Sequence, residues 1–257
     1  MMEQVARGKT IDLAYQRLYK LGGAAAGLVV ALTLVEIVAF VFFPQPSTVE
    51  GWFLLFQRSK LVGLLDFWGL EVPMYAMFVP VFLALYVVLR EADPGWMAIA
   101  TTFVLLGVGI FLATNNPFTM LSLSNRYAAA TTEAQRAALL AAGEAVLANT
   151  GQRAVGGFNV GLFLVSVAGL IVSAGMLRSD AFSRATAYVG IGAYALSLAD
   201  YVRQVLTSSP IAALLVVLPG ALLLVIWFVM VGRGLYRLGR GDVRGQSRAA
   251  RAATGTE

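Results

Sequence analysis

The chain contains no cysteine and no histidine. Without cysteine it has no disulfide framework, no thiolate nucleophile and no zinc–thiolate site. Without histidine it has no imidazole ligand for haem or for another metal, and no Ser-His-Asp triad. These absences exclude enzymes that use a thiolate, a histidine-bound metal or a Ser-His-Asp triad. We therefore expect no catalytic residue, no metal site and no cofactor, and we favour a protein that is not an enzyme.

Charged residues are scarce as well, at 13% of 257 residues, whereas 59% are hydrophobic. A soluble globule of this size would lack the polar surface to cover so apolar a chain, whose mean hydropathy is +0.77. The composition therefore predicts an all-α, integral membrane bundle with the lipid bilayer as its partner. The formal charge of +5 comes largely from the chain ends, and no aromatic and basic platform for nucleic acid is present.

Apolar runs separated by prolines, glycines and polar turns predict six transmembrane helices, since about 20 apolar residues cross a bilayer. Residues 1–20 have apolar positions at helical spacing among basic ones and predict a short cytoplasmic helix on the membrane surface. Residues 233–257 form a basic, glycine-rich tail that we expect to be disordered. Within the membrane domain, 21–232, the expected spans are about 21–43, 61–89, 96–114, 154–177, 185–206 and 211–231.

Capping motifs predict where further helices begin. Ser47-x-x-Glu50 and Thr132-x-x-Gln135 have the spacing of a capping box. Asp93 followed by Pro94 predicts the start of the third span. The second box lies in the long connection 118–153, which we expect outside the membrane as a lid over the polar residues described next.

The basic residues predict the orientation. With both termini in the cytoplasm, 13 of the 19 lysines and arginines fall on the cytoplasmic side and five on the outer side. The positive-inside rule favours this arrangement.

In this orientation, polar residues from five spans lie about 22 to 27 Å from the cytoplasmic side of a core about 30 Å thick. Charged side chains at such depth usually face other helices or a water-filled cavity. Three tyrosines can supply hydrogen-bonding walls. We therefore predict a ligand-binding layer formed by Glu36, Glu71, Tyr75, Asn115, Asn159, Tyr194, Asp200, Tyr201 and Arg203.

The charges of this layer do not balance. Asp200 and Arg203 are three residues apart on one helix and can pair, but three acids face a single arginine. At least one acid should then be protonated near neutrality, or bound to a cation or a ligand amine. We predict an outward-facing acidic cavity that binds or transports a small cationic or lipid-like ligand.

Two other interpretations stay open. The polar layer can consist of interhelical hydrogen bonds that lock a bundle, which is typical of a non-catalytic accessory or structural subunit of a membrane complex. Enzymatic activity is the weakest alternative, because Ser197 has no apparent base.

The block from Tyr127 to Leu147 is followed by Met176-Leu-Arg-Ser-Asp-Ala-Phe182 and then by Ala187-Tyr-Val-Gly190. This middle third of the chain resembles the bacterial multi-pass membrane proteins of the domain-of-unknown-function 4386 family. Such proteins often have Phe-Pro before the fifth span, where this chain has Phe182-Ser183. The resemblance implies six helices and the bacterial inner (plasma) membrane, and it implies no activity.

Overall fold

The computed structural model describes residues 2–42, 45–149, 159–207 and 209–241, and within these ranges every regular element is a helix. The helices are, in chain order, α1 (Met2–Phe42), α2 (Val49–Arg58), α3 (Lys60–Leu64), the wide π-type turn η1 (Leu65–Gly69), α4 (Glu71–Ala76), α5 (Phe78–Leu89), α6 (Pro94–Thr114), α7 (Pro117–Ala128), α8 (Glu133–Asn149), α9 (Val160–Met176), α10 (Arg184–Leu206) and α11 (Pro210–Gly239).

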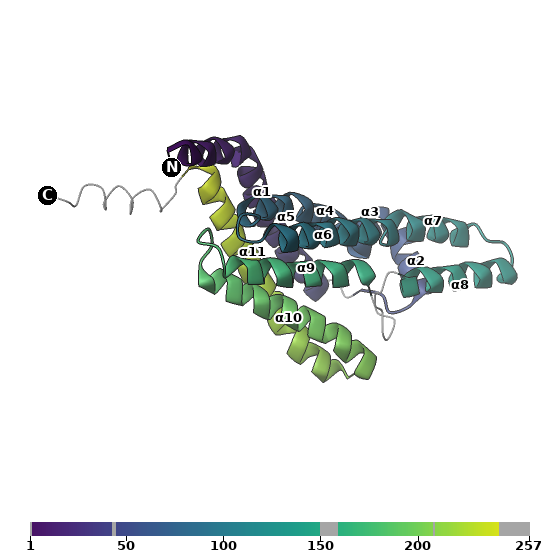
Figure 1. Ribbon diagram of the computed structural model, residues 1–257. Coiled ribbons are helices and arrows are strands. Elements are labelled where there is room, and N and C mark those ends of the chain that lie inside the picture. Colours follow the sequence, from purple (N-terminus) through teal and green to yellow (C-terminus); the bar gives the residue numbers. More distant parts are fainter. Residues whose placement is uncertain (1, 43–44, 150–158, 208, 242–257) are drawn as a thin grey trace.

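The long helices form a bundle in which α5, α6 and α9 lie side by side (Figure 1). α1 packs against α5 and α11, and α10 packs against both α9 and α11. The hairpin of α7 and α8 lies at the end opposite the start of α1 and the end of α11 (Figure 1). The main core is apolar and aromatic and includes Phe82, Leu85, Trp227 and Phe228.

Four apolar helical runs of the described part are long enough to cross a membrane: Tyr15–Ala39, Lys60–Leu89, Pro94–Ala128 and Ile211–Gly239. α9 is apolar but has only 17 residues, and the residues expected to extend it, 154–158, lie outside the described ranges. α10 has 23 residues but carries Arg184, Asp200 and Arg203. The protein is therefore an all-helical membrane protein, and four of the six expected spans meet the length and apolarity of a crossing helix.

Both ends of the membrane domain differ in detail from the expectation. The surface helix expected over 1–20 and the first span are parts of one helix, α1. At the other end, α11 continues to Gly239 rather than ending at 231. The expected tail from residue 242 onward lies outside the described residues.

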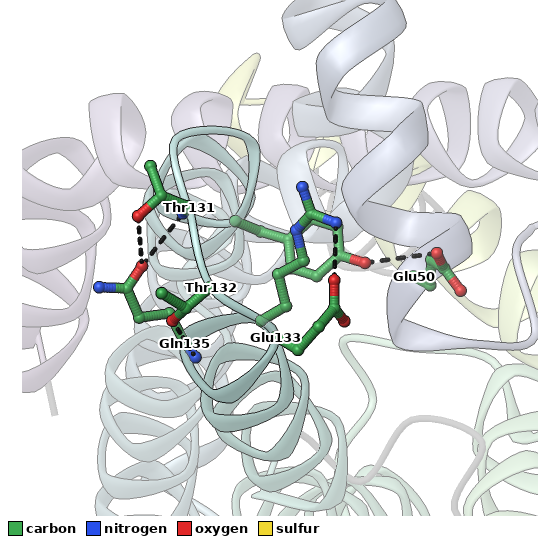
Figure 2. Close-up of polar contacts among 7 residues, drawn as sticks. Glu50, Thr131, Thr132, Glu133 and Gln135 are labelled. Carbon is green, nitrogen blue, oxygen red and sulfur yellow. Dashed lines mark hydrogen bonds and ion pairs between the residues drawn. The ribbon is translucent and has the colours of Figure 1, made fainter.

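Two of the predicted caps are confirmed. The Asp93 carboxylate accepts from the Trp96 amide at 3.2 Å, and the Thr132 hydroxyl accepts from the Gln135 amide at 3.3 Å. Gln135 Oε1 accepts in return from the amide of Thr131, one residue before the predicted partner (Figure 2).

The predicted cap at Ser47 is wrong by one residue. Thr48 caps α2, and its hydroxyl accepts from the Gly51 amide at 3.1 Å. Beginning the helix at Val49 turns four apolar side chains of α2 toward the core, namely Val49, Trp52, Phe53 and Phe56. Burial of this face outweighs the capping box, and Glu50 is left to accept from the Tyr127 hydroxyl (Figure 2).

α7 is a helix that the sequence patterns did not predict. Asn116 caps it by accepting from the Phe118 amide at 2.9 Å, and Pro117 occupies its first turn. The Ser124 hydroxyl donates to the Phe53 carbonyl at 2.8 Å, which ties α7 to α2. The connection 118–153 is thus largely a helical hairpin docked on α2.

α6 and α9 approach each other through two facing glycines. A methyl group at Gly107 would lie 2.5 Å from the Gly161 carbonyl oxygen, and one at Gly161 would lie 2.5 Å from the Gly107 carbonyl oxygen. Small residues let helix backbones touch in this way, so dispersion contacts and weak hydrogen bonds replace a hydrophobic force that lipid does not supply. The contact positions the ends of both helices, where polar residues meet.

Replacing Gly107 with alanine should push α6 and α9 apart and destabilise the protein by about 1–3 kcal/mol. Gly109→Ala on the same helix is the matched control, because nothing lies within 4 Å of a methyl group there. The control should be neutral or stabilising by up to about 1 kcal/mol, since alanine is the better helix former. Thermal unfolding of the purified protein in detergent measures both; equal melting temperatures would refute the backbone contact.

Candidate ligand-binding site

The second apolar run is broken at Phe67 and Trp68. Trp68 has φ 65° and ψ 0°, which lies in the left-handed region. In the described part it is the one non-glycine residue with a positive φ. A large aromatic residue is uncommon there, and such a conformation costs about 1–3 kcal/mol. Gly69 follows because a Cβ at that position would collide with the Leu64 carbonyl. The break turns the chain so that Glu71 begins α4 inside the bundle.

The two glutamates of the layer meet each other. Glu71 is 4% exposed, and its carboxyl lies within hydrogen-bonding reach of the half-buried Glu36 carboxyl on α1. Tyr75, one turn further along α4, interacts electrostatically with both and packs on Phe111 with ring centroids 4.2 Å apart. Among the described residues neither glutamate forms a salt bridge. Arg203 therefore does not reach these acids.

Two asparagines join the ends of α6 and α9. Asn115 ends α6 and is fully buried, and Asn159 caps α9 by accepting from the Leu162 amide at 3.1 Å. The Asn159 amide donates to Asn115 Oδ1 at 3.4 Å, and the Tyr201 hydroxyl donates to the Asn159 carbonyl at 3.4 Å. These contacts connect α6, α9 and α10 at one depth.

Asp200 is satisfied within its own helix. Its two carboxylate oxygens accept from Arg203 Nε at 2.6 Å and from Gln204 Nε2 at 2.7 Å. Arg203 also donates to the Thr207 carbonyl at 3.2 Å. The charge of Asp200 is thus neutralised locally, and its oxygens are occupied.

A cavity of about 330 Å³ lies between these elements. Its walls come from η1, α4, α5, α9, α10 and α11, and half of the lining residues have a polar side-chain atom. The volume is at the small end of the range for ligand pockets. The polar members beyond the predicted layer are Trp68, Ser166, Ser197 and Gln204.

Two polar atoms of the cavity-lining residues are buried without a hydrogen-bond partner in the described part: the Trp68 indole Nε1 and the Tyr194 hydroxyl. The Tyr194 ring is held against Gly169, where no side chain would fit, and meets Trp227 edge-on at 5.2 Å. A buried polar group without a partner costs about 1–3 kcal/mol, so each calls for an explanation.

The structure divides the nine predicted site residues into two groups. Those that line the cavity are Tyr75, Asn159, Tyr194, Asp200 and Tyr201. The other four do not line the cavity but interact with residues that do. Glu36 and Glu71 interact with Tyr75, Asn115 accepts a hydrogen bond from Asn159, and Arg203 forms an ion pair with Asp200. Of the three acids expected around a single cavity, only Asp200 is in its wall.

Sequence reasoning missed two contributors. Gln204 had a signal, because its spacing of four residues from Asp200 places both on one helix face. For Trp68 the sequence contains no signal beyond the glycine that follows it, because hydrophobic periodicity does not reveal a left-handed residue inside an apolar run.

The described part of the expected lid, helices α7 and α8, does not line this cavity. No residue of α7 or α8 lines it, and in the described part the hairpin packs on α2, α3 and η1. The Glu50–Tyr127 hydrogen bond and the Glu133–Arg136 ion pair lie in this outer region (Figure 2). The hairpin therefore supports η1.

Apolar helices that enclose a buried polar layer define an all-helical integral membrane protein. A family model described as domain of unknown function (DUF4386) matches residues 25–232, so the chain belongs to this family and the resemblance is confirmed. No curated protein and no solved structure matches the chain.

The Asp200–Arg203 pair gives a test of how the layer is balanced. Arg203→Leu leaves a partly buried carboxylate with Gln204 alone and should destabilise the protein by about 1–3 kcal/mol. The double variant Asp200→Leu/Arg203→Leu removes both charges and should be closer to the wild type than the single one. Thermal unfolding of the wild type, the single variant and the double variant in one detergent measures these differences in stability. A double variant less stable than Arg203→Leu would contradict local pairing of Asp200 and Arg203.

Proposed function

We propose that this protein binds a small lipid-like ligand in the cavity between α4, α9, α10 and α11. The observation that carries the proposal is the pocket itself, whose walls combine apolar side chains with polar ones such as Ser166, Ser197 and Tyr201. A ligand with both an apolar and a polar part satisfies both features.

The surroundings of the cavity favour entry from the bilayer. The ends of α10 and α11 next to the cavity expose large apolar side chains, among them Val205, Ile211 and Leu215, each more than two-thirds exposed. In a membrane these side chains face lipid. An apolar or amphipathic molecule then reaches the cavity without crossing water.

Two elements of the cavity lack regular helical hydrogen bonding. One is the break at Trp68, and the other is α11 around Pro219, next to Gly220 in the cavity wall. α11 stays one continuous helix, whereas the run at Trp68 is broken, and broken helices form the binding sites of many transporters. They favour a cavity that changes shape, as transport of the ligand would require.

The second candidate is an accessory or structural subunit. Asp200 supports it, because both carboxylate oxygens are already occupied within α10. A cationic ligand gains little from an acid in this state, so the pairing favours the lipid-like over the cationic ligand.

We also propose that α9 and α10 cross the membrane, which gives six spans with both termini in the cytoplasm of a bacterial inner (plasma) membrane. The native chain has no cysteine, so single cysteines report topology directly. Ala129→Cys, exposed between α7 and α8, should react with an impermeant maleimide in intact spheroplasts. Asp180→Cys, exposed between α9 and α10, should react only after lysis. Labelling of both before lysis would indicate four spans.

Filling the cavity should abolish binding. Ser197→Phe places a large ring in the wall of the cavity, whereas Ala199→Phe adds the same ring at an exposed position two residues along α10. Native mass spectrometry of protein purified in mild detergent should show a retained small molecule in the wild type and in Ala199→Phe, but not in Ser197→Phe. Equal retention in all three folded proteins would refute binding at this site.

A further inference from the structure

A second cavity, of about 320 Å³, is an open groove between α1 and α11 that shares no lining residue with the first cavity. The two helices touch at one edge of it, where a methyl group at Gly23 would lie 3.0 Å from the Gly232 carbonyl oxygen. Gly27, one turn further along α1, also lines the groove, and nothing lies within 4 Å of a methyl group there. The backbones therefore meet at Gly23 and leave space beside Gly27.

This groove faces the bilayer. α1 and α11 both contain apolar runs long enough to cross a membrane, Tyr15–Ala39 and Ile211–Gly239. Gly27 is exposed, and the side chain of Leu28 next to it is 44% exposed. Small residues of spanning helices usually pack against another helix, but at Gly27 the described part of the chain places none. A lipid chain can therefore lie in the groove.

One end of the groove is cationic. Arg233 and Tyr236 line it from α11, and the Arg233 side chain is exposed, so its guanidinium is accessible. Arg240 lies over the Tyr236 ring, with its guanidinium carbon 4.7 Å from the ring centre, and it donates to the Tyr236 hydroxyl at 3.3 Å. Lys20 of α1 packs against Gly239, near the end of α11. Among the described residues, none of these three cations forms an ion pair.

The charge of this end selects the occupant. A second copy of the chain would bring the same cations to the same place, because a twofold interface pairs identical surfaces, and like charges would repel. A zwitterionic lipid would carry its ammonium group toward arginines, and no acidic side chain of the described part lines the groove to pair with it. The phosphate of an anionic lipid meets an accessible guanidinium, which binds phosphate through charge-assisted hydrogen bonds.

We propose that the groove between α1 and α11 binds one anionic phospholipid of the phosphatidylglycerol type, with its phosphate at Arg233 and an acyl chain over Gly27 against Val30 and Phe228. Basic pockets between spanning helices bind the head groups of anionic lipids. Tyr236 is suited to the same depth, since its ring is apolar and its hydroxyl is polar. This site is separate from the cavity of the proposed function and does not depend on it.

The first test is a native mass spectrometry titration of the full-length protein in detergent with phosphatidylglycerol and with phosphatidylcholine of the same chains. The wild type should bind the first phosphatidylglycerol about tenfold more tightly than phosphatidylcholine. Arg233→Gln should lower the affinity for phosphatidylglycerol about fivefold to tenfold and remove most of this preference. Arg184→Gln, at an exposed arginine of α10 outside the groove, is the matched control and should bind like the wild type.

A second pair of variants tests the groove itself. Gly27→Leu fills it and should lower the affinity for phosphatidylglycerol at least fivefold. Gly109→Leu makes the same change on α6, at another exposed glycine with nothing within 4 Å of a methyl group, and should leave the affinity unchanged. Glycerol 3-phosphate, which has the phosphate without the chains, should not displace the lipid at equal concentration.

Each part of the proposal can fail separately. Equal affinity of the wild type for the two lipids would overturn the anionic class. Binding of phosphatidylglycerol that neither Arg233→Gln nor Gly27→Leu weakens would overturn the groove as its site. Displacement by glycerol 3-phosphate would indicate a site for a soluble phosphate, and a dimer in the same spectra that Gly27→Leu abolishes would assign the groove to a second copy. If Gly27→Leu does not fold, as judged by gel filtration, Arg233→Gln at its exposed position decides.

Discussion

The bilayer core provides no hydrogen-bond partners, so a polar group that this chain carries into its apolar helices is costly unless another group of the protein satisfies it. The ends of α6 and α9 show how this constraint is met. Asn115 and Asn159 lie at helix ends, bond to each other, and connect to α10 through Tyr201. Each asparagine also bonds to its own helix or its neighbouring threonine. Helix ends can therefore lie inside the bundle.

Close packing then determines where the cavity forms. α6 and α9 touch backbone to backbone at Gly107 and Gly161, so no space remains between them. α10 and α11 line the cavity together with Trp68, where the chain departs from regular helix geometry. The space left between the rigid pair and the broken run is the cavity. The aromatic rings of Tyr75, Trp68 and Phe111 pack on one another along its edge.

Sequence reasoning predicted features that depend on composition and local chemistry. The all-helical membrane class, the cap at Asp93 and the cap at Thr132 follow from apolar run lengths and from side chains that bond within four residues. It failed at Ser47 because burial of an apolar face moved the helix start, and at Trp68 because only tertiary packing sustains that conformation. Depth along the membrane grouped nine polar residues, but depth does not reveal which of them line the same cavity, and five of the nine do.

Charged residues in an apolar sequence are the first candidates for a functional site. In this protein the charged residues of the polar layer are already paired or in contact with one another. Asp200 has its arginine and its glutamine, and Glu36 and Glu71 have each other. The buried side-chain groups without partners in the described part are all neutral: the indoles of Trp68 and Trp227 and the hydroxyls of Ser173 and Tyr194. Desolvation explains the difference: an isolated charge is too costly to bury and must bring its partner from the protein, whereas an unpaired neutral donor is costly but tolerable. A membrane protein can therefore tolerate an unpaired neutral donor in its core where it could not tolerate an unpaired charge.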